Sequence, residues 1–326
     1  MWPSVRFEHL SKDVAKILFN RRLPPRVDAI LTADWHLRDS IPACRTEGFL
    51  DVQWRNMEVV SALQSLYDCP VLHAGDLFHH WRSSPELIAM AMKMLPRQFI
   101  TIYGNHDLPY HSFAHKVKSA LYVLEVGRHV KVINGVYWEA EQREEIQPDP
   151  INIHGKRILL GHLLIRAPGC EAVWMDENAM SVDEVFEKYD FDIMVTGHYH
   201  LPFRIWRGER LLINTGPLTI QALGPFLNPP NPSVYLLDVE GGRLIEMEIP
   251  EPQDTFALRE EKADGINSKL IDDFVQSLSE LRGQVDVDSN IDQLIKIIEE
   301  KYHVHPRVAR ILYDLFQEAQ ELSDGN

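Results

Sequence analysis

Short apolar runs that each end at polar side chains recur along the chain, with amphipathic segments between them. The stretches VDAILTAD (27–34), PVLHAGD (70–76) and QFITIYGNHD (98–107) have the character of buried strands that stop at Asp, His or Asn. Between them, residues 49–68 and 83–95 carry apolar side chains about three to four residues apart, which is typical of helices. Strands that alternate with helices predict a parallel-rich α/β sheet, with the polar residues gathered at its carboxyl edge.

Two later stretches repeat this pattern and add histidines. ILLGH places His162 after an apolar run, and DIMVTGHYH does the same for His198 and His200. A glycine precedes the polar side chain in every such turn except the first, and glycine permits tight turns and close backbone approach. We therefore expect all five turns to contribute to one site.

The composition narrows the class of protein. The 326 residues are 45% hydrophobic, which is ample for a folded core. No run of roughly 18 or more apolar residues occurs, so we expect no membrane partner. The widely separated Cys44, Cys69 and Cys170 form no CxxC pair. This pattern disfavours a disulfide framework and a thiolate zinc site, and favours a cytoplasmic location.

The pattern along the chain predicts three parts. Residues 1–26 are expected to be an N-terminal amphipathic extension whose helix docks on the domain surface. Its apolar positions follow helical spacing: Leu10, Val14, Ile17 and Leu18. Residues 27–252 carry the strand-end turns, with QREEIQPDP (142–150) expected to be a polar loop. Residues 253–326 have helical periodicity and acidic faces, and would either cap a site or dock a partner.

The charge is unevenly distributed. The net charge is −15, but residues 1–130 hold 15 Lys or Arg against 13 Asp or Glu. Residues 131–250 hold 10 against 18, and residues 251–326 hold 8 against 17. The overall sign disfavours tight non-specific binding of nucleic acid, and a phosphate-rich polymer would meet least repulsion on the first segment. Bound cations would change that local balance, so a metal-dependent enzyme acting on phosphates remains compatible with it.

The turns together offer ligands for two divalent cations. A pair of cations about 4 Å apart needs a bridging carboxylate and a mixture of oxygen and nitrogen donors. The candidate ligands are Asp34, His36, Asp76, Asn105, His162, His198 and His200. This mixed donor set suits Mn²⁺, Fe²⁺ or Zn²⁺ better than Mg²⁺ or Ca²⁺.

The ordered motifs D-x-H, G-D, G-N-H-D, G-H and G-H-x-H resemble those of the calcineurin-like metallophosphoesterases, over about residues 27–250. The resemblance implies a four-layer α/β/β/α sandwich with a small C-terminal helical appendage. It implies one metal held by Asp34, His36, Asp76 and His200. It implies a second metal held by Asp76, Asn105, His162 and His198, so that Asp76 is the bridge. His106 would then face the scissile phosphate, and Asp107 would orient His106.

Within that family, GDLFHH is similar to the signature of SbcD-type DNA double-strand-break repair nucleases. This resemblance implies that His79 lies near the phosphate, whereas His80 has no counterpart. It also implies DNA, an SMC-like ATPase of SbcC type and a second copy of the chain as partners. No GxxxxGK[ST] motif occurs, so any use of ATP would come from another chain. The C-terminal part looks like the abbreviated tails of phage-type members.

The function expected on these grounds is a two-metal phosphodiesterase, a hydrolase of ester bonds that acts as a DNA exo- or endonuclease. Two alternatives stay open. One is an enzyme for a small substrate such as a cyclic nucleotide, a dinucleoside polyphosphate, a lipid pyrophosphate or a phosphoprotein, which the negative charge favours. The other is a non-catalytic scaffold, which the complete ligand set disfavours.

Several further residues have simpler expected roles. His73 lies within a predicted strand and is expected to be a hydrogen-bonded core residue. His111 and His115 are expected on a solvated face or at the rim of the site, and His303 and His305 on the surface. NTGP (214–217) would either line a phosphate pocket or only form a turn.

Overall fold

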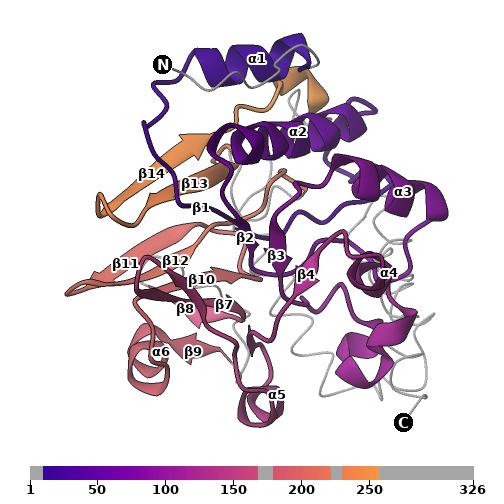
Figure 1. The fold of residues 1–326 in the computed structure, drawn as a ribbon. Helices are drawn as coiled ribbons and strands as arrows, with labels where there is room; N and C mark the ends of the chain where they lie inside the picture. The colour runs from indigo at the N-terminus through magenta and orange to yellow at the C-terminus, as the bar shows by residue number, and fades with distance from the viewer. Residues whose placement is uncertain (1–9, 168–178, 222–229, 257–326) are drawn as a thin grey trace, which may run out of the picture. The chain divides into compact units, whose positions relative to one another are not determined.

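Parallel strands from the first half of the chain form the centre of the first sheet (Figure 1). The computed structural model describes residues 10–167, 179–221 and 230–256. The strand order is β14-β13-β1-β2-β3-β4. The strands are β1 (Ala29–Thr32), β2 (Val71–His73), β3 (Phe99–Thr101), β4 (Lys131–Val132), β13 (Ser233–Asp238) and β14 (Arg243–Glu248). Strands β1 to β4 pair in parallel, and β13 and β14 add an antiparallel hairpin beside β1.

The second sheet has the order β11-β12-β10-β7-β5, and β6 pairs with β7 as well. Its strands are β5 (Val136–Tyr137), β6 (Ile151–Ile153), β7 (Lys156–His162), β10 (Ile193–Gly197), β11 (Phe203–Arg207) and β12 (Arg210–Asn214). The neighbours β5, β7, β10 and β12 run parallel, so their carboxyl ends share one edge. A small sheet pairs β8 (Ile165–Arg166) with β9 (Met180–Ser181).

Helices connect and cover these sheets. The α-helices are α1 (Lys12–Phe19), α2 (Phe49–Tyr67), α3 (Pro85–Met94), α4 (Ala120–Val126), α5 (Ala140–Glu145) and α6 (Val182–Lys188). Short 3-10 helices are η2 (Pro109–His111), η3 (Phe113–Lys118) and η4 (Gln253–Thr255). The two helices predicted at 49–68 and 83–95 are confirmed as α2 and α3. The loop predicted at 142–150 is wrong at its start, because helix-forming Gln, Arg and Glu residues extend α5 to Glu145.

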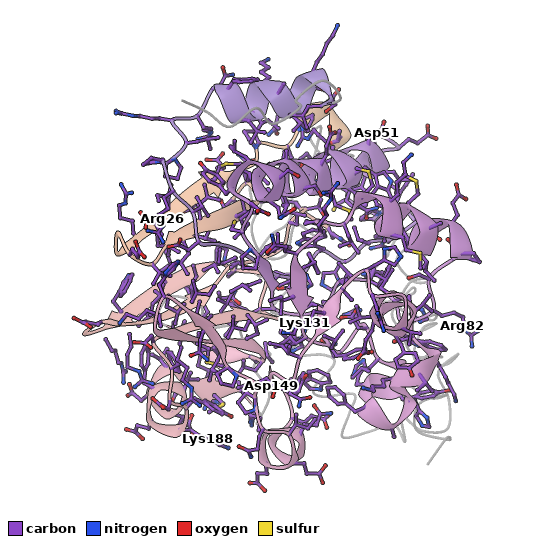
Figure 2. All side chains as sticks on the ribbon, in the orientation of Figure 1. Arg26, Asp51, Arg82, Lys131, Asp149 and Lys188 are labelled. Carbon is purple, nitrogen blue, oxygen red and sulfur yellow. The ribbon has the colours of Figure 1, made fainter. Side chains whose placement is uncertain are left out.

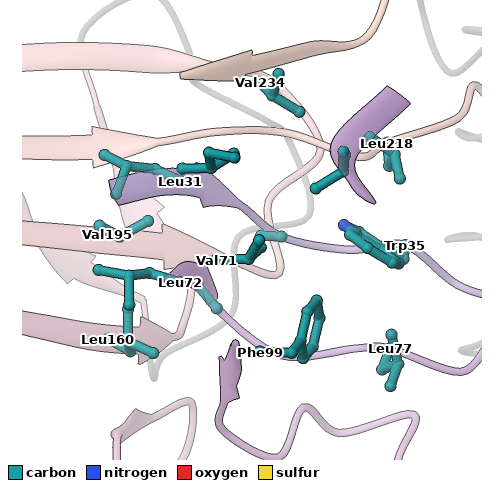
Figure 3. Close-up of a cluster of buried hydrophobic side chains, with 14 of the residues drawn as sticks. Leu31, Trp35, Val71, Leu72, Leu77, Phe99, Leu160, Val195, Leu218 and Val234 are labelled. Carbon is teal, nitrogen blue, oxygen red and sulfur yellow. The ribbon is translucent and has the colours of Figure 1, made fainter. Parts of the chain in front are cut away.

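The two sheets pack face to face across one apolar core. Leu31 and Leu72 of the first sheet lie beside Val195 and Leu160 of the second (Figure 3). All four side chains are buried, so this interface is a substantial source of hydrophobic stabilisation.

Each sheet buries its other face under helices. Buried residues of α2, including Met57 and Leu63, belong to the same core as the first sheet. Leu159 and Met194 of the second sheet instead pack in a separate cluster with Val185 of α6. The layers are therefore α/β/β/α, as predicted, with α2 and α6 on opposite sides (Figure 1).

Helix α1 lies along α2 (Figure 1), where the sequence predicted a docking helix. Val14 and Leu18 are buried, and the half-buried Ile17 packs against the core. The Ser11 side chain caps the helix, and the backbone N–H of Ser11 donates to Glu58 Oε1 of α2 at 2.8 Å. Apolar contacts and one polar contact thus join this segment to α2.

Many charged side chains lie at the periphery, as the labelled Asp51, Arg82 and Lys188 illustrate (Figure 2). No helix in the described part of the chain is long and apolar enough to span a bilayer. The chain divides into two compact units, 1–258 and 259–326. The predicted C-terminal helices, together with Cys170, His303 and His305, lie outside the described residues.

Candidate metal centre

The predicted site residues come together at the carboxyl edges of both sheets. Ligand atoms of Asp34, His36 and His200 lie within 4.8 Å of one another. Ligand atoms of Asp76 and two further histidines form a second such group; these histidines are His162 and His198. The strands β1, β2, β7 and β10 lead into these turns, so segments far apart in sequence meet in one site.

Asp76 lies between the two groups. Its Oδ2 is 3.6 Å from His36 Nε2 on one side and 3.3 Å from His162 Nε2 on the other. Asn105 joins the second group, with Oδ1 at 3.0 Å from His162 Nε2 and 2.9 Å from His198 Nδ1. Every residue predicted as a ligand is therefore in the cluster, and Asp76 has the position that a bridging carboxylate requires.

Several of these ligand residues have left-handed backbone conformations, which determine the directions of their side chains. The φ angles are 51° at Asp34, 45° at His36, 57° at Asp76 and 83° at His198. Each such residue costs about 1–3 kcal/mol and persists only where its surroundings impose it. Backbone hydrogen bonds do so here, because the N–H groups of Asp34 and His36 donate to the carbonyls of Gly75 and Asp76, both at 3.0 Å.

Glycines allow the turns to approach one another closely. Gly75 has φ +91°, and a Cβ there would lie 2.6 Å from His162 Nδ1. A Cβ at Gly104 would collide with the Asp76 side chain. Glycine is therefore required at both positions if the carboxylate and imidazole are to converge.

The electrostatics of the cluster suit divalent cations. Burial raises the pKa of Asp34 to about 8 and lowers the pKa of His36 well below its ordinary value. Burial alone would lower the pKa of His162, but the Asp76 carboxylate raises it to about 9. Among the described residues, no Lys or Arg forms an ion pair with Asp34 or Asp76. A buried group of carboxylates and imidazoles without a lysine or arginine partner fits metal ions in donor type.

His106 lies beside this cluster and is oriented by a backbone carbonyl. Its Nδ1 donates to His79 O at 2.8 Å, and its ring centre is 4.9 Å from that of His36. Because Nδ1 carries the donated proton, Nε2 remains available for another partner. The half-buried His79 stacks on His106, with ring centres 5.4 Å apart.

Asp107 holds the backbone of both turns. Its buried carboxylate accepts hydrogen bonds from the N–H groups of Gly104 at 3.0 Å, Leu77 at 3.2 Å and Phe78 at 3.0 Å. The carboxylate thereby fixes the turn that carries His106 against the turn that carries Asp76. These three hydrogen-bond partners are backbone groups, so any orienting effect on His106 passes through the main chain.

A family comparison agrees with this geometry. Residues 30–242, more than half of the chain, match the calcineurin-like phosphoesterase superfamily domain. The chain belongs to this superfamily. Its fold is thereby that of a metallophosphoesterase, a hydrolase that acts on phosphoesters, and its clustered Asp and His side chains form candidate metal-binding groups.

The solved structures to which the chain is similar have low sequence identity to it. An archaeal phosphodiesterase is 14% identical, with a TM-score of 0.39, and the match covers 68% of this chain and 99% of that one. The phosphoesterase YfcE of E. coli is 16% identical, with a TM-score of 0.36 and coverages of 68% and 99%. Zinc-complexed Vps29 of Entamoeba histolytica is 18% identical, with a TM-score of 0.34 and coverages of 66% and 88%. No curated protein matches the chain.

The remaining histidines of the phosphoesterase lie largely where expected. His73 is buried in β2 with Nδ1 at 2.8 Å from Thr101 Oγ1, which confirms it as a core residue. His111 is exposed, and its ring centre is 6.5 Å from that of Trp138. Trp138 in turn lies 6.5 Å from the His198 ring, so His111 is near the rim of the metal cluster. His115 is half-buried and follows on η3.

The NTGP stretch supports the turn that bears His198 and His200. Asn214 Nδ2 donates to Leu201 O at 2.8 Å and also to Tyr199 O. Gly216 has φ +69°, and Pro217 forms a bridge with Ala33. The stretch is therefore a turn that positions the histidine pair.

Sequence reasoning missed two glutamines that hold the loop after His36, and it missed Arg38 within that loop. Gln221 Nε2 donates to His36 O at 2.9 Å and is within reach of Trp35 O at 3.3 Å. Gln53 of α2 forms two hydrogen bonds with the backbone of Arg38. Only Arg38 had a signal in the sequence, since it lies two residues after the D-x-H motif in DWHLRD.

Proposed function

We propose that this metallophosphoesterase is a two-metal-dependent DNA exo- or endonuclease of SbcD type that acts in DNA repair or recombination. The observation that carries the proposal is the pair of stacked histidines, His79 and His106, beside the metal cluster. His79 belongs to GDLFHH, the stretch that resembles the nuclease signature. This stretch lies in residues 1–130, the most basic segment of the chain. A phosphate polymer would meet least repulsion on that segment.

The seven clustered ligands would hold two cations. One would take Asp34, His36, Asp76 and His200, and the other Asp76, Asn105, His162 and His198, with Mn²⁺ preferred over Fe²⁺ or Zn²⁺. When bound, such cations polarise phosphate oxygens and make water a stronger acid near neutral pH. The left-handed turns keep the ligands in place before any cation arrives, which lowers the cost of ordering them.

His106 acts on the leaving oxygen. Its Nδ1–H is committed to the His79 carbonyl, so the second proton of the imidazolium form is on Nε2, which gives it to the departing alkoxide oxygen or donates a hydrogen bond to the phosphate. Burial, followed by the nearby charge of Arg38, lowers the pKa of His79 to about 4. His79 is thus neutral at physiological pH and assists as a hydrogen-bonding group, and Asp107 keeps both turns in register.

The partners of the proposed nuclease are DNA, an SMC-like ATPase of SbcC type and a second copy of the chain, in the cytoplasm. The ATPase would supply ATP hydrolysis, because this chain has no phosphate-binding GxxxxGK[ST] loop. The net charge of −15 favours a second candidate, a phosphodiesterase for a small substrate.

Cleavage assays separate these two candidates. We would incubate the protein and Mn²⁺ with end-labelled linear duplex DNA, single-stranded DNA and bis-p-nitrophenyl phosphate. The nuclease proposal predicts cleavage of DNA and of the generic diester. Hydrolysis of the diester with intact DNA would overturn the nuclease and move the function to the small-substrate candidate.

The His106→Asn variant tests the catalytic role within the same assays. We expect it to retain the metal content of the wild type and to lose about 10²- to 10⁴-fold in turnover, the usual contribution of general acid catalysis. His115→Asn, on η3, is the matched control and should keep normal turnover. If His106→Asn loses metal as well, His106 is a ligand and its proposed role is wrong.

A further inference from the structure

Arg38 is held firmly beside the metal cluster. Its backbone N–H donates to Gln53 Oε1 at 2.9 Å, and its carbonyl accepts from Gln53 Nε2 at 3.1 Å. Its guanidinium donates through Nε to Ser40 Oγ at 3.0 Å and through a terminal nitrogen to Gln221 Oε1 at 3.3 Å. Four hydrogen bonds thus fix both the main chain and the side chain of this residue.

The charge of Arg38 has no close counter-charge in the part of the chain that the structure describes. The side-chain partners are a hydroxyl and an amide, and no carboxylate there forms an ion pair with the half-buried guanidinium. Asp39 attracts it only at longer range, and burial lowers the pKa of the guanidinium. A desolvated guanidinium with neutral partners is suited to an anion that arrives from solution.

Backbone pairing places this cation next to the histidines that flank the metal cluster. Leu37 N–H donates to Leu77 O at 2.8 Å, and His79 N–H donates to Leu37 O at 3.0 Å. The segment after His36 therefore runs in parallel beside the segment after Asp76, and Arg38 follows directly at the level of His79. The two residues are close enough for the Arg38 charge to affect the imidazole.

We propose that Arg38 binds a second phosphate of the substrate, next to the phosphate that is cleaved. The inference rests on the proposed phosphodiesterase site and names its substrate class: a diester whose chain carries a neighbouring phosphate, as in an oligonucleotide. The metal ligands act on the scissile group, whereas Arg38 lies beyond His79 and recognises the next anion along the chain. A guanidinium provides the planar pair of donors that a phosphate accepts.

Inhibition of bis-p-nitrophenyl phosphate hydrolysis tests this subsite, because that diester carries a single phosphate. The competitors are the dinucleotide dTpdT and its forms phosphorylated at the 5′ or the 3′ end, with Mn²⁺ in excess. In the wild type, one phosphorylated form should inhibit about 10- to 100-fold more strongly than dTpdT, as expected for charge-assisted hydrogen bonds. Arg38→Gln should abolish that difference and leave kcat for the generic diester within about threefold.

Two variants make the outcome decisive. Arg38→Lys keeps the charge and should retain part of the discrimination, and Arg128→Gln, at an exposed position after α4, should behave like the wild type. Equal inhibition by all three dinucleotides in the wild type would overturn the subsite. So would a parallel loss of diester turnover in Arg38→Gln and Arg38→Lys, which would show that the residue only supports the His36 loop.

These results are independent of the DNA assays. A chain that leaves DNA intact but discriminates phosphorylated dinucleotides through Arg38 refutes the nuclease and keeps the subsite. A chain that cuts DNA without such discrimination keeps the nuclease and refutes the subsite.

Discussion

Two buried charged clusters of this metallophosphoesterase are built in opposite ways. The first, which we call the arginine cluster, consists of Arg45, Asn56, Glu251 and Thr255. Arg45 and Glu251 are paired with 0% side-chain exposure each. Arg45 also donates to Thr255 Oγ1 at 3.0 Å, and its guanidinium lies 4.0 Å from the centre of the Phe256 ring. This cluster contains its own cation and is neutralised by the folded chain.

The metal centre has no lysine or arginine among the described residues. Asp34 and Asp76 are both buried, and their close side-chain partners are imidazoles. Backbone N–H groups of His198 and His106 also donate to them. Among the predicted ligands, the His162 imidazole is the one that can carry a positive charge, because the Asp76 carboxylate raises its pKa, and it would lose its proton when it binds a metal. The difference shows that one buried charged cluster can contribute to stability alone, while another offers its side chains as ligands for metal ions.

A short segment connects the two clusters. Ile220 donates its N–H to Glu251 Oε1 at 3.0 Å and accepts at its carbonyl from Arg45 at 2.9 Å. The next residue, Gln221, donates to the carbonyl of His36. The arginine cluster therefore anchors the segment that braces the metal-binding loop.

The largest expected effect comes from Asp76→Asn. This change removes the negative charge shared by both groups of ligands, and we expect kcat/KM for Mn²⁺-dependent diester hydrolysis to fall by about 10³-fold or more. The free energy of unfolding in EDTA should fall too, because the Asp76 carboxylate pairs with the His162 imidazole and accepts a hydrogen bond from the backbone N–H of His106. Glu209→Gln, at an exposed carboxylate, is the matched control. Normal turnover in Asp76→Asn would contradict its bridging position.

Breaking the arginine cluster should instead cost stability. Arg45→Met leaves the Glu251 carboxylate buried and unpaired, which should lower the free energy of unfolding by about 3–5 kcal/mol in urea titrations. The double variant Arg45→Met/Glu251→Leu should recover part of this loss, since neither charge remains. A double variant as unstable as the sum of the single variants would show that the ion pair is not the main term.

Metal binding should stabilise the folded protein through the metal centre and not through the arginine cluster. At a Mn²⁺ concentration about 100-fold above the dissociation constant, the wild type should gain about 2.7 kcal/mol over protein in EDTA. Thermal melts should show the same gain in Arg45→Met and a much smaller one in Asp76→Asn. An equal gain in Asp76→Asn would place the stabilising metal elsewhere.

The smallest effect is expected for Gln221, in the segment that connects the two clusters. Gln221→Leu removes the hydrogen bonds to the loop of His36, which should cost about 1 kcal/mol of stability and about fivefold in diester turnover. Gln142→Leu, on α5, serves as a control for loss of a glutamine. Unchanged turnover in Gln221→Leu would mean that the loop keeps its geometry without this brace.

The sequence was most informative where strand and turn patterns are local. Each predicted ligand lies at or just after the end of an apolar strand, so parallel strand order alone brings Asp34 and Asp76 to one edge of the first sheet, and His162 and His198 to one edge of the second. The alternation of strands and helices predicted a parallel-rich sheet, whereas the α/β/β/α layers were implied by the family resemblance. The His106 ring was less predictable, because its partner is the backbone carbonyl of His79 rather than a motif side chain.

The supporting residues could not be predicted. Gln221 contacts a carbonyl 185 positions away, and Arg45 pairs with a carboxylate 206 positions away. Such contacts join a side chain to another part of the fold and leave no periodic trace in either segment. They follow from the final packing of the two sheets, which no local pattern specifies.

The left-handed turns at Asp34, His36, Asp76 and His198 have a consequence for how such a site changes over generations. Glycine tolerates those backbone angles without strain, so mutational drift toward stability favours it wherever ligation no longer matters. A descendant that had abandoned catalysis should accumulate glycine at these four positions before its hydrophobic core changes.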